Sequence, residues 1–299
     1  MGKLIILSGP SGVGKGPLVK TLDIYLCSIK RKLHRHILYT TRIKKMNEVH
    51  QDTYFYSYLM NVNERKWGDY KYDKVEAESN LLLIKEEAIN KGEEFLIFSV
   101  REEQNQGINF SELHKNLKDN DVVLLEIFQK CVDDVISFCA ANPINGKPID
   151  VIKVFISPLS DDDYKALGCK TEKRRAIATE ATMTVKLRSR EREGEDKIKE
   201  RANTAIKEVE EARKRRRKEK YIVNHFGEDM KSAWTMLQTR VGSVPEYYEY
   251  GKKTSFSLTG EIDKTFRKFL EKVFPEIPKH NCINELNGNT CRICGKLHL

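Results

Sequence analysis

The sequence predicts an α/β fold with a mostly parallel sheet and helices on both of its faces. Continuous apolar runs at residues 122–127 and 151–156 are typical of strands that are covered on both faces. Segments with helical periodicity, such as residues 79–91, lie between such runs. Buried strands that alternate with helical segments along a chain favour a parallel sheet with helices on either side.

The elements are assigned in chain order. Residues 3–8 form a short apolar strand, which is followed by a glycine-rich turn and by a helix from about Pro17 to Ile29. Proline is acceptable there because the first helical turn has no intrahelical partner for its N–H groups. Residues 161–220 form a long, charged segment with helical character. The remaining predicted strands are residues 37–41, 54–58, 95–100, 122–127, 151–156 and 221–223.

Length and composition bound the class of protein. The 299 residues are enough for one large domain, or for a domain with a smaller appendage. No segment approaches the roughly 18 uninterrupted apolar residues that a membrane helix needs, and no export signal is evident. Seven cysteines without an export signal favour reduced thiols, so we expect a cytoplasmic protein with no membrane partner.

The positive charge is unevenly distributed. The net charge is +9, and residues 186–220 alone hold 15 Lys/Arg against 9 Asp/Glu. A basic segment of this kind serves either a nucleic acid or a small anion such as a polyphosphate. The accompanying motifs decide between the two.

The glycine-rich turn carries the strongest motif. Residues 9–15 read G-P-S-G-V-G-K and fit the pattern G-x-x-x-x-G-K, directly between a buried strand and a helix. The glycines allow successive backbone N–H groups to form a concave anion nest, and the helix N-terminus adds positive potential. Lys15 adds a full charge near the β/γ-phosphates. We therefore expect triphosphate binding by Gly9, Ser11, Gly12, Val13, Gly14, Lys15 and Gly16.

The magnesium ligand of this motif is missing. The Ser or Thr expected after the lysine is Gly16, and Pro17 follows it. The hydroxyl at this position normally contacts Mg²⁺. Its absence leaves the metal to water, to phosphate oxygens and to other side chains, so we expect triphosphate binding to be retained and the magnesium dependence to be changed.

The chain resembles guanylate kinases. Residues 4–16 resemble the start of these enzymes, although Pro17 stands where some of them carry Thr. The segment Y-T-T-R that ends at Arg42, with Lys45, Glu48 and Tyr54-Phe55, is similar to the family segment that grips the acceptor phosphate. The resemblance implies that Arg42, Lys45 and Tyr54 hold this phosphate. Lys45 replaces an arginine, which keeps the charge but loses the bidentate fork.

A helical lid is the next match. The segment from Leu187 to Arg190, followed by Ile198 and Arg201, resembles the family's R-L-x-x-R…I-x-x-R-L, whose arginines close over the transferring phosphoryl group. Planar cations stabilise the charge that the transition state spreads over the phosphoryl oxygens. The resemblance implies a P-loop kinase fold with a lid at about 161–220 and an insertion around 161–182. It also implies catalytic roles for Lys15, Arg190 and Arg201, and a place for Asn224 near the adenine. The alternative is that these arginines are solvated charges on a helix.

The positions that would read a guanine base depart from the family. Lys66 stands before Trp67 where the family has a Glu, and Phe128 replaces an Asp. Guanine presents N–H donors, and a lysine offers them no acceptor, so unpaired groups would reduce the preference for guanine. Glu126 is retained in its strand and is a candidate Mg²⁺ ligand, or else a chance acid at a strand end. We expect acceptor-phosphate binding with weak or altered guanine selectivity.

The C-terminal part is expected to be separate. The resemblance implies a guanylate-kinase-like domain at residues 1–240, with a divergent insertion at about 73–120. Residues 241–299 form an appendage of a linker, a predicted amphipathic helix at 261–274 and a cysteine-rich tail.

The tail has the ligand types of a zinc site. A C-x2-C turn presents two thiolates to one tetrahedral ion, and three thiolates with an imidazole suit one structural Zn²⁺. His280 is a rival for the fourth position, and idle thiols at a chain end explain the pattern equally well. The candidate ligands are Cys282, Cys291, Cys294 and His298.

These features predict a phosphotransferase that uses ATP and Mg²⁺ and acts on GMP or a related phosphate-bearing acceptor. One alternative is a non-catalytic guanylate-kinase-like module, although modules of this kind typically lose the phosphate loop that is retained here. The other is a nucleic-acid-binding or end-modifying P-loop protein. The basic run at 213–218 would serve it, but a solvated helix face is sufficient explanation, and a nucleic-acid partner is not favoured.

Overall fold

The computed structural model describes residues 2–28, 31–44, 50–51, 54–61, 66–68, 70–101, 104–159, 161–188, 194–215, 220–223, 286–287 and 290–291. The chain divides into two compact units. Unit 1 is Met1–Leu4 with Lys32–Val151, and unit 2 is Ile5–Arg31 with Ile152–Leu299.

Unit 1 contains a parallel strand pair. β2 (Leu33–His36) pairs with β9 (Val122–Glu126), so that Leu33 lies opposite Val122. β9 has the first residues of β1 (Lys3–Ser8) as its other neighbour, and the backbone N–H of Lys3 donates to Asp121 O at 2.9 Å. Four successive apolar residues of β9 are buried, as expected for a strand that is covered on both faces.

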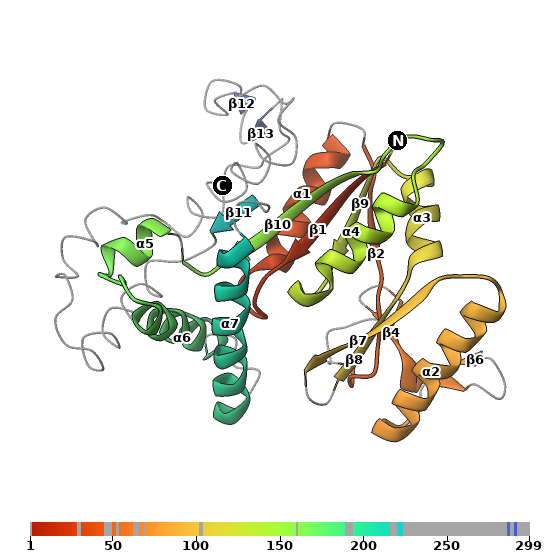
Figure 1. Ribbon diagram of the computed structural model, residues 1–299, viewed down its shortest axis with the longest axis horizontal. Helices are drawn as coiled ribbons and strands as arrows, with labels where there is room; N and C mark the ends of the chain where they lie inside the picture. Colours follow the sequence, from red (N-terminus) through yellow and green to blue (C-terminus); the bar gives the residue numbers. More distant parts are fainter. Residues whose placement is uncertain are drawn as a thin grey trace. The chain divides into compact units, whose positions relative to one another are not determined.

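A second sheet of unit 1 has the order β4-β3-β8-β7. β3 pairs in parallel with β4 and antiparallel with β8, which also pairs antiparallel with β7. Helix α2 lies beside β7 and β8 (Figure 1) and packs Leu81, Ile84 and Ala88 against Phe95. The strands are β3 (Tyr39–Thr40), β4 (Phe55–Tyr56), β7 (Phe95–Arg101) and β8 (Gln104–Asn109), and the helix is α2 (Lys74–Asn90).

The shorter elements of unit 1 complete its core. They are the 3₁₀ helices η1 (Ser57–Leu59) and η2 (Gln129–Cys131), the hairpin β5 (Met60–Asn61) and β6 (Lys66–Trp67), and the helices α3 (Phe110–Asp119) and α4 (Val132–Ala141). Residues 73–120, expected as a divergent insertion, form α2, β7, β8 and α3, and their side chains contribute to the core of unit 1.

Unit 2 contains the other parallel pair. β10 (Asp150–Ser157) pairs with β11 (Lys220–Val223), with Phe155 opposite Tyr221, and β10 has the later residues of β1 as its other neighbour. The helices of this unit are α1 (Lys15–Ser28), α5 (Asp161–Ala166), α6 (Glu172–Arg188) and α7 (Glu195–Arg215).

Helices α6 and α7 are adjacent (Figure 1) and share a core cluster. Met183 and Leu187 of α6 pack against residues that recur every three or four positions on α7, namely Ile198, Ala202 and Ala205. This spacing places the α7 residues on one helix face, and the alanines allow a close approach.

The predicted α/β class is confirmed. Both parallel pairs lie among helices, and the predicted strand, turn and helix at the N-terminus correspond to β1, the loop and α1. The strand expected at 37–41 is wrong in its bounds, because β2 ends at His36 and β3 covers only Tyr39–Thr40. Helix α2 begins five residues earlier than expected, since the Asp73 side chain caps it by accepting from Glu76 N at 2.9 Å.

In the C-terminal segment after residue 240, the structure describes only a short hairpin. β12 (Leu286–Asn287) pairs antiparallel with β13 (Thr290–Cys291). The predicted helix at 261–274 lies outside the described residues. The division at residue 240 stays a prediction. Within the described part of the chain, no helix is both long enough and apolar enough to cross a membrane.

Candidate functional site

The loop between β1 and α1 has a backbone that depends on glycine. Gly9, Gly12 and Gly14 have φ angles of +138°, +98° and +105°. A Cβ atom at Gly9 would lie 2.5 Å from Ile156 O, and one at Gly12 would lie 2.8 Å from Leu187 Cδ2. Positive φ in a tight turn allows successive backbone N–H groups to point into one concave anion nest. The loop is therefore fixed by conformation and by close packing.

Lys15 is folded back over this loop. It is the first residue of α1, and its Nζ donates to Gly9 O at 2.6 Å and to Pro10 O at 3.1 Å. The half-buried ammonium group is thereby held at the loop, next to the N-terminus of a 14-residue helix. Ammonium and helix N-terminus both attract an anion.

Gly16 differs from the other loop glycines. It is exposed, its φ is not positive, and a Cβ at this position would meet no atom within 4 Å. The missing hydroxyl of the motif is thus not excluded by the backbone or by packing. A serine at this position would fit.

Helices α6 and α7 contact the loop inside unit 2. Arg201 of α7 donates from Nη1 to Ser11 Oγ at 3.3 Å, across 190 positions in the sequence. Leu187 of α6 lies against Gly12. Two residues that the resemblance placed in a lid therefore lie at the loop between β1 and α1. Arg190 and Asn224 lie outside the described residues.

Lys186 is a cation that the sequence analysis did not single out. It is only 5% exposed and directly precedes Leu187 on α6. A buried ammonium group requires compensating partners, because desolvation of a charge is costly. The signal for it was present in the sequence, since Lys186 occupies the first position of the R-L-x-x-R pattern.

The predicted acceptor residues of unit 1 are partly brought together. The Arg42 guanidinium lies over the Tyr54 ring at 4.7 Å and the Tyr56 ring at 5.4 Å, and its Nη1 donates to Ile43 O at 3.1 Å. The two tyrosine rings meet edge to face at 6.1 Å. Lys45 lies outside the described residues.

The aromatic cluster around Arg42 extends beyond the predicted residues. Tyr58 is buried, its hydroxyl accepts from Lys44 N at 3.3 Å, and its ring meets that of Tyr72 at 5.2 Å and 87°. Sequence reasoning missed Tyr56 and Tyr58. The alternation of Tyr56 with Tyr54 was an available signal, because residues i and i+2 share a face in extended backbone. Tyr58 lies in η1, so this pattern does not extend to it.

Glu126 is held in an ion pair. Its Oε2 accepts from Arg35 Nη2 at 3.2 Å, and both side chains are partly exposed. No group of three His, Cys, Asp or Glu side chains suited to a metal occurs among the residues that the structure describes. Of the predicted zinc ligands, only the backbone of Cys291 is described, in β13.

The candidate base-reading positions offer few acceptors. Lys66 is exposed on β6, and the neighbouring Trp67 ring lies 4.5 Å from the His50 ring. Burial, with a contribution from Lys44, lowers the pKa of His50. Two acids that follow this segment in the chain are exposed, since Asp73 caps α2 and Glu76 is in its first turn.

No protein-family model and no curated protein matches this sequence. Among solved structures, the guanylate kinase from Anaplasma phagocytophilum is similar, with 16% sequence identity and a TM-score of 0.40. The similarity covers 92% of this chain and 96% of that chain. A similarity this distant supports no conclusion about fold or function, so the functional assignment depends on the residues described above.

Proposed function

We propose that this protein is a phosphotransferase with a P-loop kinase fold, which transfers the terminal phosphoryl group of ATP to a nucleoside monophosphate. The single observation that carries the proposal is the loop after β1, with three glycines at positive φ, Lys15 folded over it and Arg201 in contact with it. The resemblance of the loop and lid motifs to guanylate kinases supports the same function.

The loop and Lys15 bind the triphosphate in this proposal. Three positive-φ glycines permit backbone N–H groups to converge on one anion. The Lys15 ammonium, which donates to two loop carbonyls, needs only to turn toward the bound phosphates, because carbonyl partners are exchanged for more strongly accepting phosphate oxygens.

Arg201 stabilises the transferring group. Its Nη1 lies 3.3 Å from a hydroxyl of the phosphate loop, so its guanidinium is within reach of phosphate oxygens bound there. The planar cation neutralises charge that spreads over the phosphoryl oxygens in the transition state. Arg190 is proposed to act in the same way.

Arg42 and Tyr54 hold the acceptor phosphate, together with Lys45. The Arg42 guanidinium is oriented by two tyrosine rings, which reduces the entropy that it loses on binding. A phosphate acceptor is already an anion, so no general base is needed. Charge and a hydroxyl recognise a phosphate whatever base it carries.

The magnesium ion accompanies ATP as part of the substrate. The described residues do not form a ready metal site, because Gly16 has no hydroxyl and Glu126 pairs with Arg35. A role for Glu126 as a magnesium ligand would require that pair to open. No step is therefore assigned to a metal held by the protein.

The two alternatives have less support. A non-catalytic module has no need of the positive-φ loop glycines or of Lys15. A nucleic-acid function would draw on the basic run, yet Arg213 is 20% exposed at its side chain and is engaged with Asp161 and the Tyr164 ring. We therefore keep the kinase proposal, with a cytoplasmic location.

The test is an activity screen. Purified protein is incubated with ATP and with GMP, AMP, CMP or UMP in turn, and ADP formation is measured. We expect the wild type to form ADP and Lys15→Ala to form none. The preference for GMP should be far weaker than a site with two well-placed hydrogen-bond acceptors for guanine would give. No turnover with any acceptor would contradict the proposed function. A strong preference for GMP would contradict only the part that concerns the base.

A further inference from the structure

We propose that Arg213 is a positioning residue for Arg201, because it fixes the C-terminal half of α7 to α5 and so holds the other half at the phosphate loop. The inference rests on the proposed function, since it concerns the arginine that stabilises the transferring group. It assigns a role to the segment around 161–182, which the sequence analysis could only describe as an insertion.

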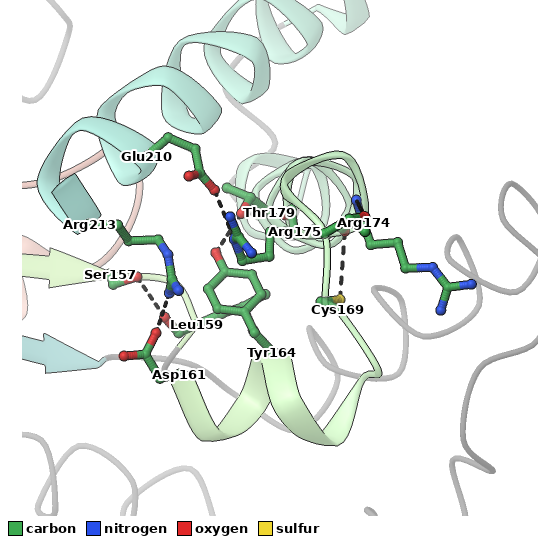
Figure 2. A network of polar contacts seen from close by, with 11 residues as sticks. Ser157, Leu159, Asp161, Tyr164, Cys169, Arg174, Arg175, Thr179, Glu210 and Arg213 are labelled. Carbon is green, nitrogen blue, oxygen red and sulfur yellow. Dashed lines mark hydrogen bonds and ion pairs between the residues drawn. The ribbon is translucent and has the colours of Figure 1, made fainter.

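Arg213 joins α7 to α5 by two different contacts (Figure 2). Its guanidinium forms an ion pair with Asp161, the first residue of α5. The same guanidinium lies 5.1 Å from the centre of the Tyr164 ring. A planar cation is suited to both contacts at once, because it donates in its plane and stacks through its face.

The Tyr164 ring is itself fixed. It is 2% exposed, and its hydroxyl lies 2.6 Å from Thr179 Oγ1 of α6. Burial raises the pKa of this hydroxyl well above its usual range, so the hydroxyl keeps its proton and this bond in alkaline solution as well. Arg213 therefore rests on a ring that connects α5 to α6 (Figure 2).

A second ion pair and a core cluster hold the same end of α7. Arg175 Nε of α6 donates to Glu210 Oε1 at 3.3 Å, with side chains 20% and 14% exposed. Val209 and Ala212 of α7 pack in one cluster with Tyr164 and Leu159. The fixed end of α7 thus comprises its last two turns.

The other half of α7 carries Arg201. Its guanidinium donates to Ser11 Oγ, and the neighbouring α7 side chains in the core are Ile198 and the small Ala202 and Ala205. Arg201 and Arg213 are 12 residues apart in one unbroken helix, about 18 Å along its axis. A helix transmits a shift or tilt along such a length, so the fixed end sets where Arg201 lies.

A double-mutant cycle tests this role. The proteins are the wild type, Arg201→Ala, Arg213→Ala and the double variant, with Arg213→Lys as a milder change that keeps the charge and loses the fork. We expect Arg213→Ala to lower kcat about tenfold and to leave KM for the acceptor unchanged. In the Arg201→Ala background, the same change should lower kcat by less than about twofold. Arg213→Lys should fall in between.

Lys214→Ala is the matched control, since it removes the next, exposed cation of the same helix. Its kcat should equal that of the wild type. Independent effects of Arg201→Ala and Arg213→Ala that multiply in the double variant would overturn the inference. So would an unchanged kcat for Arg213→Ala.

Hydrogen exchange separates this inference from the proposed function. If the wild type turns over no acceptor, the proposed function is contradicted. Exchange of the amides of residues 198–205 still measures how firmly the helix around Arg201 is held. Arg213→Ala should speed their exchange about tenfold relative to Lys214→Ala, because the fixed end of the helix is released. Equal exchange in the two variants would overturn the positioning role.

Discussion

At the residue scale, the candidate site is determined mainly by glycine. Gly9 and Gly12 leave no room for a Cβ atom, and both have positive φ. The sequence predicted this loop because the glycine spacing is itself the physical requirement. The hydrogen bond from Arg201 to Ser11 could not be predicted from spacing, since it joins residues 190 positions apart. Only the resemblance to a family placed Arg201 near the loop.

Gly16→Ser tests the missing hydroxyl. The position is exposed and open, and its φ is not positive, so we expect stability within about 0.5 kcal/mol of the wild type. The new hydroxyl follows Lys15, where it can contact Mg²⁺. Turnover should then reach half its maximum at a lower magnesium concentration. An identical magnesium titration for both proteins would mean that this position does not face the metal.

His36 predicts a pH dependence of stability. It is 3% exposed, and burial lowers its pKa from 6.5 to about 3, with a contribution from His34. Between pH 6.5 and about 3, the unfolded chain therefore binds a proton at His36 that the folded chain does not bind. The free energy of unfolding falls as the pH falls through this window. Urea unfolding at pH 7 and pH 5 should show a smaller loss for His36→Leu than for the wild type. Equal losses would exclude His36 as the source.

At the element scale, strongly apolar strands were predictable and polar ones were not. β9 and β10 are apolar runs, whereas β2 reads L-H-R-H and β8 reads Q-N-Q-G-I-N. These polar strands form because neighbouring strands supply hydrogen-bond partners, an effect that local propensity does not contain. The early start of α2 was missed because Asp73 acts as its cap.

Tyr164→Phe tests the connection of α5 to α6. The change removes the hydroxyl that lies 2.6 Å from Thr179 Oγ1, while Thr179 keeps its bond to Arg175 O at 2.9 Å. We expect a loss of about 1 kcal/mol in the free energy of unfolding. Tyr70→Phe is the control, since Tyr70 is exposed. A loss no larger than that of the control would show that this hydrogen bond contributes nothing.

At the scale of the whole molecule, the chain consists of two units whose candidate residues have different tasks. Unit 2 holds the loop, Lys15 and Arg201, and unit 1 holds Arg42 and Tyr54. The sequence motifs predict these tasks, because phosphate sites require particular charges, and the tasks stay predictions. The base-reading residues could not be predicted, because Lys66 and Phe128 stand where the family has carboxylates, and neither side chain offers an acceptor.

The C-terminal tail gives a separate prediction. Protein purified without chelators should contain about one zinc per chain, because three cysteines and a histidine match a tetrahedral site. The double variant Cys291→Ser, Cys294→Ser should lose the metal, whereas Cys131→Ser, a change at a buried thiol of unit 1, should keep it. Metal analysis that finds no zinc in the wild type would leave these thiols without a ligand role.

The central claim is that the loop after β1 binds a nucleoside triphosphate, and calorimetric titration with ATP tests it most directly. We expect the wild type to bind ATP with millimolar or better affinity. We also expect the affinity to fall at least about tenfold in Lys15→Ala, which removes the charge next to the phosphates. Lys214→Ala removes an exposed cation far along α7, and this variant should bind ATP as the wild type does. No heat of binding from the intact protein, or equal affinity for the wild type and Lys15→Ala, would contradict the claim.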